Sequence, residues 1–214
     1  MTENRSDHGR ERGRAATEGT VVTGGEPSPR RSRARSLTRD LMIAAAFGAI
    51  GAVLLVVVAP VTTSLAATFP PAYAAVAGIH SVLPYLARRL LVLPFAATLV
   101  GGLVGVLSFA STALGPLILF SLLAATLPFD LVLNAGRRFA PALRARHYAV
   151  AAVASAVVLF LVSLPVFSAE RLTVWMAVAV LAGRLIGQCG AVWLSALIAG
   201  AVHRAGIRRK APAG

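Results

Sequence analysis

The sequence predicts an all-α membrane protein, built as a bundle of six transmembrane helices with both termini in the cytoplasm. Of its 214 residues, 57% are hydrophobic and only 14% are charged, and the mean hydropathy is +0.76. The apolar residues form runs that are long enough to cross the hydrocarbon core of a bilayer as helices. The basic residues fall between these runs in a pattern that indicates one orientation. We therefore expect a multi-pass protein of the plasma (cytoplasmic) membrane.

Composition divides the chain into three parts. Residues 1–36 are rich in Arg, Gly, Glu and Ser, with little to bury, which predicts a disordered, basic cytoplasmic tail. Residues 37–203 form the six-helix transmembrane domain, and residues 204–214 are a short basic cytoplasmic tail. The basic cluster at 29–36 can touch anionic membrane lipid, but a charged anchor for the topology is the simpler interpretation. A cleaved signal peptide is disfavoured, because the segment before the first apolar run is too long.

The first span, residues 40–59, has no charge after Asp40. At about 100° per residue its side chains separate by size around the helix. One side carries small residues: Ala44, Ala45, Gly48, Ala49, Gly51 and Ala52. The other side carries Ile43, Phe47, Ile50 and Leu54. A small face lets two helices approach closely in lipid, so it serves either packing within the bundle or docking of another protein.

Five further spans follow, at residues 69–86, 90–107, 114–133, 148–167 and from 172 to about 201. The link between the second and third spans is predicted to be only residues 87–89, so these helices should be antiparallel neighbours. The third span carries a ladder of small residues, Ala97, Gly101 and Gly105. Two predicted outward loops contain turn-forming residues at positions 60–64 and 108–112.

The distribution of basic residues supports six spans with an N-terminus inside the cell. With that orientation only Arg171 lies outside and Arg184 lies within a span, so the other nineteen of the 21 Lys and Arg residues are cytoplasmic. Five spans would move the later basic loops to the opposite side. The two termini are therefore both predicted to be cytoplasmic.

Polar residues at membrane depth are costly, so each is a candidate for substrate binding. The candidates are Asp130, Asn134, Arg184, Gln188, His80, Trp175 and Glu170. Asp130 and Arg184 differ in predicted depth by about 10 Å, which allows an ion pair between the fourth and sixth spans. Either residue alternatively contacts a substrate. For His80 a hydrogen-bonded packing role is favoured, and Glu170 is most simply part of a wet loop.

The motifs of several enzyme classes are absent from the sequence. It has no G-x-x-x-x-G-K-[ST], so the chain drives nothing with ATP alone, and no H-E-x-x-H or G-x-S-x-G. Cys189 is its one cysteine, which leaves no thiol metal site. We expect no catalytic residues, no metal and no cofactor, and no nucleic-acid partner because the basic residues lie in tails and short loops. The sequence has no clear internal repeat, which counts against an inverted-repeat transporter.

Two segments resemble the S components of energy-coupling factor (ECF) vitamin transporters. The first is LTRDLMIAAAFGAIGAVL, residues 37–54, which contains an Ala-x-x-x-Ala pattern at Ala45 and Ala49 and a second ladder at Ala44, Gly48 and Ala52. The second is ATLPFDLVLNAGRR, residues 125–138, which is similar to a span-four segment of the thiamine/hydroxymethylpyrimidine group, with Asp130 in the place of its acidic residue. The sequence departs from that group at residues 124–126, where the group favours a Gln-Gly.

This resemblance implies a substrate-capture subunit of an ECF importer for a small vitamin or vitamin precursor. It implies docking of the first helix, through Ala44, Ala45, Gly48, Ala49 and Ala52, onto a membrane T component energised by a pair of ATPases. The pocket is expected among the outer halves of spans four to six and the outward loops. The alternative is a small structural or accessory integral membrane protein without transport activity.

Overall fold

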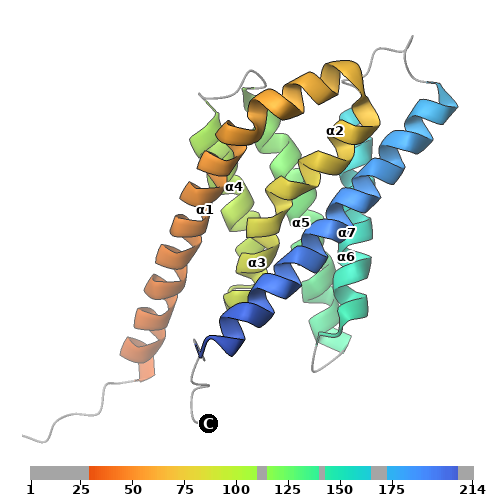
Figure 1. Ribbon diagram of the computed structural model, residues 1–214. Helices are drawn as coiled ribbons and strands as arrows, with labels where there is room; N and C mark the ends of the chain where they lie inside the picture. The colour runs from red at the N-terminus through yellow and green to blue at the C-terminus, as the bar shows by residue number, and fades with distance from the viewer. Residues whose placement is uncertain (1–28, 110–114, 140–142, 165–172, 207–214) are drawn as a thin grey trace, which may run out of the picture.

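A computed structural model describes residues 29–109, 115–139, 143–164 and 173–206, with side chains from Leu37 onward. Within these residues the regular structure is entirely helical, which confirms the all-α class (Figure 1). The helices are α1 (Pro29–Thr68), α2 (Pro70–Val76), the 3₁₀ helix η1 (Ala77–Ser81), α3 (Val82–Leu90), α4 (Ala96–Ser108), α5 (Pro116–Phe139), α6 (Ala145–Ser163) and α7 (Val174–Arg204). Residues 1–28 of the predicted tail and residues 207–214 lie outside the described residues.

Helix α1 is longer than its apolar run. It begins at Pro29, so residues 29–36 of the predicted tail are helical, and it continues through Pro60 to Thr68. The outward loop predicted at residues 60–64 is therefore wrong. The hydroxyls of Thr62 and Ser64 donate to carbonyls of the preceding turn, at 3.0 Å to Ala59 and 3.0 Å to Pro60. An internal proline and such back-bonding bend helices, and Figure 1 shows α1 bending in its second half across one end of the bundle.

The second predicted span is a broken helix. Helices α2, η1 and α3 follow one another without a gap from Pro70 to Leu90. The predicted link at residues 87–89 is wrong, because these residues form the last turn of α3 and the chain leaves the helix at Leu91. The charges of Arg88 and Arg89 suggested a loop, but both side chains find partners inside the bundle. The two helices joined by residues 91–95, α3 and α4, are neighbours as predicted.

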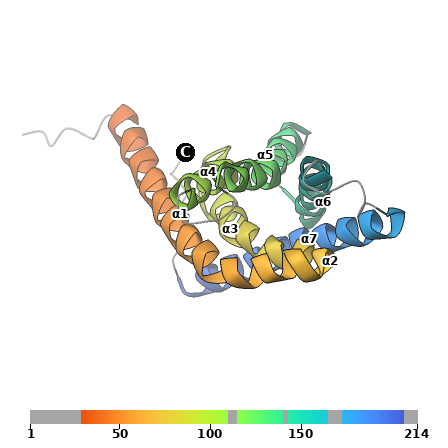
Figure 2. The ribbon, with the colours of Figure 1, turned by 90° about the horizontal axis from the view of Figure 1, so that it is seen from above.

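The helices surround α3. Seen from above in Figure 2, α1 lies beside α4, α4 beside α5, α5 beside α6, and α7 beside both α6 and α2. Helix α3 contacts α4 and α7, and its residues Tyr85 and Ala87 are fully buried. The small-residue ladder of α4 packs against α5: a Cβ on Gly101 would lie 2.8 Å from Thr126, and one on Gly105 would lie 2.7 Å from Leu119.

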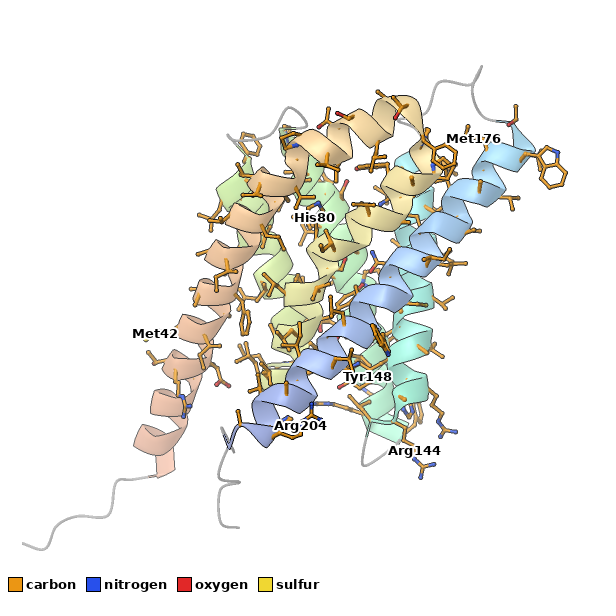
Figure 3. All side chains as sticks on the ribbon, viewed as in Figure 1. Met42, His80, Arg144, Tyr148, Met176 and Arg204 are labelled. Carbon is orange, nitrogen blue, oxygen red and sulfur yellow. The ribbon has the colours of Figure 1, made fainter. Side chains whose placement is uncertain are left out.

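Four of the described helices are long and apolar enough to cross a membrane: residues Leu37–Thr68 of α1, and α5, α6 and α7. Helix α4 is a shorter apolar helix, and α2 to α3 is the broken segment. The start of α1 and the end of α7 lie at the same end of the bundle (Figure 1). Figure 3 shows Arg144 and Arg204 toward that end and Met176 at the opposite end. That the Arg204 end faces the cytoplasm stays a prediction.

Candidate functional site

The one carboxylate of α5 is fully buried, with one oxygen hydrogen-bonded and the other in an ion pair. Asp130 Oδ2 accepts hydrogen bonds from the backbone N–H of Thr98, at 2.7 Å, and from its hydroxyl, at 2.8 Å. Asp130 Oδ1 lies 3.0 Å from Nε of Arg88 in an ion pair whose side chains are 0% and 1% exposed. Arg88 also donates to Asn134 Oδ1, at 2.5 Å, and to the carbonyl of Leu93, at 2.6 Å. This cluster ties α3, α4 and α5 together.

The predicted ion pair between Asp130 and Arg184 is therefore wrong. Similar depth along two helices allows an ion pair but does not fix the direction in which either side chain leaves its helix. The partner of Asp130 is Arg88, which lies in the last turn of α3 and not in the predicted loop. Asn134 is held by protein groups as well, because its amide nitrogen donates to the carbonyl of Pro94 at 2.8 Å and its oxygen accepts from Arg88. Both residues hold the bundle together at the α3–α4 turn.

Arg89 makes a second set of contacts at the same end. Its Nε donates to the hydroxyl of Ser195, at 3.0 Å, and its terminal nitrogen to the carbonyl of Val192, at 3.3 Å. Its guanidinium carbon lies 3.9 Å from the centre of the Tyr148 ring, which is a cation–π geometry. Arg89 thus joins α3 to α6 and α7.

A neutral polar network occupies the middle of the bundle. The hydroxyl of Tyr85 donates to Gln188 Oε1, at 2.5 Å, and also lies 3.1 Å from the carbonyl of Ala125. Gln188 Nε2 lies 3.2 Å from the hydroxyl of Ser81. The Tyr85 ring stacks on Phe129 with 3.8 Å between the ring centres. Gln188 was a predicted substrate contact, but its oxygen and its nitrogen both have protein partners.

Nearer the start of α7, its backbone touches that of α2 and η1. A Cβ on Gly187 would lie 2.5 Å from the carbonyl oxygen of Ala75. A Cβ on Gly183 would collide with the carbonyl of Pro71, and one on Gly78 with the backbone of Gly187. The Gly-x-x-x-Gly spacing of Gly183 and Gly187 thus allows close helix contact, as small residues do in membranes.

Arg184 lies between these two glycines and points into the bundle. It belongs to the buried face of α7, together with Val180, Gln188, Ala191 and Ser195. Its side chain is 6% exposed, and its guanidinium carbon lies 5.4 Å from the centre of the Tyr73 ring of α2. Its buried Nε has no hydrogen-bond partner among the described residues. Arg184 is thus a buried cation whose hydrogen-bonding capacity is incompletely used.

The other predicted site residues are dispersed. His80 lies on η1, partly buried, and its buried Nδ1 has no hydrogen-bond partner among the described residues (Figure 3). Trp175 is 83% exposed at the start of α7, so its side chain does not point into the bundle. Glu170 lies outside the described residues. Within the described residues, no group of three or more His, Cys, Asp or Glu side chains is placed to hold a metal ion.

The small face predicted on α1 is divided in two. Ala44 and Gly48 are buried, and a Cβ on Gly48 would lie 2.8 Å from Cβ of Leu103 in α4. Ala45 and Ala49 are exposed, and Ala52 is half-buried. The inner small residues therefore pack within the bundle, and only the Ala45–Ala49 side is open to another protein.

Several side-chain partners of the candidate residues were not predicted from the sequence: Tyr73, Ser81, Tyr85, Arg88 and Thr98. Arg88 and Tyr85 stand three residues apart, on one side of a helix. That spacing is a usable signal, but two adjacent arginines between apolar runs also predict a loop. Tyr73 gave no comparable signal, because its role depends on how α2 lies against α7.

The arrangement of the helices matches that of a membrane transporter subunit of known structure. A chain described as an S-component of an ECF transporter, known from a crystal structure, superimposes with a TM-score of 0.70. The match has 21% sequence identity and covers 79% of this chain and 86% of that chain. No protein-family model and no curated protein matches the sequence. The chain therefore has the fold of an S component of an ECF transporter.

Proposed function

We propose that the chain is the substrate-capture subunit of an ECF-type importer for a small vitamin or vitamin precursor. The observation that carries this proposal is the shared fold, with a TM-score of 0.70 over 86% of the S-component chain. The absence of a nucleotide-binding motif from the sequence agrees with it, because such a subunit takes its energy from separate ATPases.

The contacts favour a different binding region from the one expected from the sequence. Asp130, Asn134 and Gln188 have protein partners for their polar groups and serve the packing of α3, α4, α5 and α7. Arg184, beside Tyr73, is a charged predicted site residue that combines burial with unused donor capacity. It lies ten residues from the start of α7, or roughly 15 Å along the helix. We therefore assign substrate capture to the region where α2 and α7 meet, entered from the Met176 end.

Docking on a T component is assigned to the outer side of α1. Ala45 and Ala49 are exposed one helical turn apart, and exposed Met42 and Val53 flank them. A surface of small side chains allows close approach of a partner helix without strong polar contacts. Such a contact suits a subunit that binds and leaves its transport module.

Uptake measurements test this function directly. In a bacterial strain that needs an external vitamin, expression of the chain with a T component and an ATPase pair should restore growth on trace amounts of that vitamin. Omission of the T component should abolish the rescue. In parallel, the purified chain should show a higher melting temperature with one member of a vitamin panel. A chain that neither binds any panel member nor co-purifies with the T component would instead be a structural or accessory membrane protein.

A further inference from the structure

We propose that the captured molecule carries a carboxylate and that Arg184 is its counter-charge. This inference rests on the proposed substrate-capture function and specifies the chemistry of its ligand. It starts from the positive charge of Arg184, which no carboxylate among the described residues faces.

Arg184 is 6% exposed and lies on the inward face of a membrane-spanning helix. A buried cation in such a place is expensive unless an anion faces it. The described residues contain two carboxylates, Asp40 on α1 and Asp130 on α5, and neither forms an ion pair with Arg184. Asp130 is engaged by Arg88 and Thr98. We therefore expect the anion that faces this guanidinium to come from the ligand.

The surroundings of Arg184 set limits on that ligand. The Tyr73 ring lies 5.4 Å from the guanidinium carbon, and this cation–π contact stabilises the charge without neutralising it. The buried Nε remains a free donor among the described residues. A guanidinium offers parallel N–H groups that match the two oxygens of a carboxylate. A cationic ligand would be repelled at this position, and a neutral one would leave the guanidinium without a counter-charge.

The bundle is closed one turn deeper than Arg184. Gln188 is 1% exposed and is held between Tyr85 and Ser81, and the Tyr85 ring is stacked on Phe129. On the α2 side, Gly183 and Gly187 bring the two backbones into contact. The charged group of a ligand that enters from the Met176 end would therefore stop at Arg184, with the rest of the molecule toward the membrane surface.

The first test uses matched ligands on the unmodified protein. Binding of biotin, pantothenate and nicotinate is compared with binding of biotinamide, pantothenol and nicotinamide, which replace each carboxylate by a neutral group. We expect one of the three carboxylates to bind, and its neutral partner to bind about 10- to 100-fold more weakly, as for loss of a hydrogen bond to a charged group. Thiamine, hydroxymethylpyrimidine, riboflavin and pyridoxal phosphate complete the panel. Equal binding within a pair, or binding of one of these four alone, would overturn the carboxylate assignment while leaving substrate capture intact.

A second test asks whether Arg184 makes the discrimination. Arg184→Gln should reduce the affinity for the carboxylate by about 10- to 100-fold and leave that for the neutral partner unchanged, and Arg184→Lys should retain part of the preference. Arg204→Gln is the matched control, because it removes an exposed arginine near the other end of the same helix, and it should leave the preference unchanged. Retained preference in Arg184→Gln, or an equal loss of preference in Arg204→Gln, would overturn the role of Arg184. If no panel member binds the unmodified chain, substrate capture itself fails and this inference fails with it.

Discussion

Buried charges in this bundle belong to two different situations. Arg88 and Asp130 form an ion pair at 3.0 Å, and Thr98 and Asn134 hydrogen-bond to them, so the two charges are compensated within the protein. Arg184 has an aromatic ring beside it and no described carboxylate as a partner. A compensated pair stabilises the fold only while both partners are present, because removal of one leaves the other buried and unpaired. We propose that the uncompensated charge of Arg184 serves the ligand.

The Arg88–Asp130 pair gives a prediction at the scale of single residues. Asp130→Asn or Arg88→Gln alone should lower the free energy of unfolding by about 3–5 kcal/mol, since each leaves one buried charge without its partner. The double variant should cost clearly less than the sum of the two single changes. Thermal or denaturant unfolding of the detergent-solubilised protein measures these energies.

The pair of Asp130 and Arg184, predicted from the sequence, supplies the control. Asp130→Asn combined with Arg184→Gln should be additive, because these two residues have no contact and no shared partner among the described residues. Coupling of Asp130 to Arg184, together with additivity of Asp130 and Arg88, would contradict the observed geometry.

Helix contacts in the bundle depend on where small residues fall. The ladder on α4 packs against α5, as its sequence indicates, because Gly101 and Gly105 meet Thr126 and Leu119. Gly183 and Gly187 have the same spacing on α7, and they bring it against α2 and η1. Spacing alone identifies a face that can be approached closely, but it does not identify the partner. The partner of the Gly183–Gly187 face depends on the break of the second span at η1, where the sequence predicts one continuous helix.

The α2–α7 contact gives the prediction at the scale of elements. Gly187→Ala should lower the free energy of unfolding by about 1–3 kcal/mol, because its Cβ would lie 2.5 Å from the carbonyl oxygen of Ala75 and the two backbones must separate. Gly190→Ala, on the same helix, is the matched control. A Cβ on Gly190 meets nothing within 4 Å, and alanine has the higher helix propensity, so stability should be unchanged or raised by up to about 1 kcal/mol. Equal melting temperatures for the two variants would argue against a close contact at Gly187.

At the scale of the whole molecule, the order of the apolar segments could be read from the sequence because transfer of long apolar helices into lipid dominates the energetics. Four of the predicted spans are helices long and apolar enough to cross a membrane, and the start of α1 and the end of α7 lie at one end of the bundle. The loops were predicted less well. Residues 60–64 and 87–89 look like loops by their prolines, hydroxyls and charges, but in the fold these groups are satisfied within helices. Partners of buried polar groups depend on the relative rotation of helices, which no single segment encodes.

The exposed side of α1 gives the prediction for assembly with a T component. Ala45→Leu and Ala49→Leu place bulk on the exposed side of α1, so they should prevent co-purification of the chain with its T component by holding the two helices apart. Folding and ligand binding by the isolated chain should survive, because neither side chain is buried in the bundle. Ala149→Leu, an exposed alanine of α6, should leave both assembly and binding unchanged.

Gly48→Leu separates the two sides of α1. Its side chain would be driven into Leu103 of α4, because even a Cβ at Gly48 would lie 2.8 Å from Cβ of Leu103. This variant should lose stability and ligand binding together with assembly, whereas Ala45→Leu and Ala49→Leu should lose assembly alone. Pull-down of the complex and ligand binding are measured on the same four preparations. If Ala45→Leu and Ala49→Leu assemble as well as Ala149→Leu does, the outer side of α1 is not the docking surface.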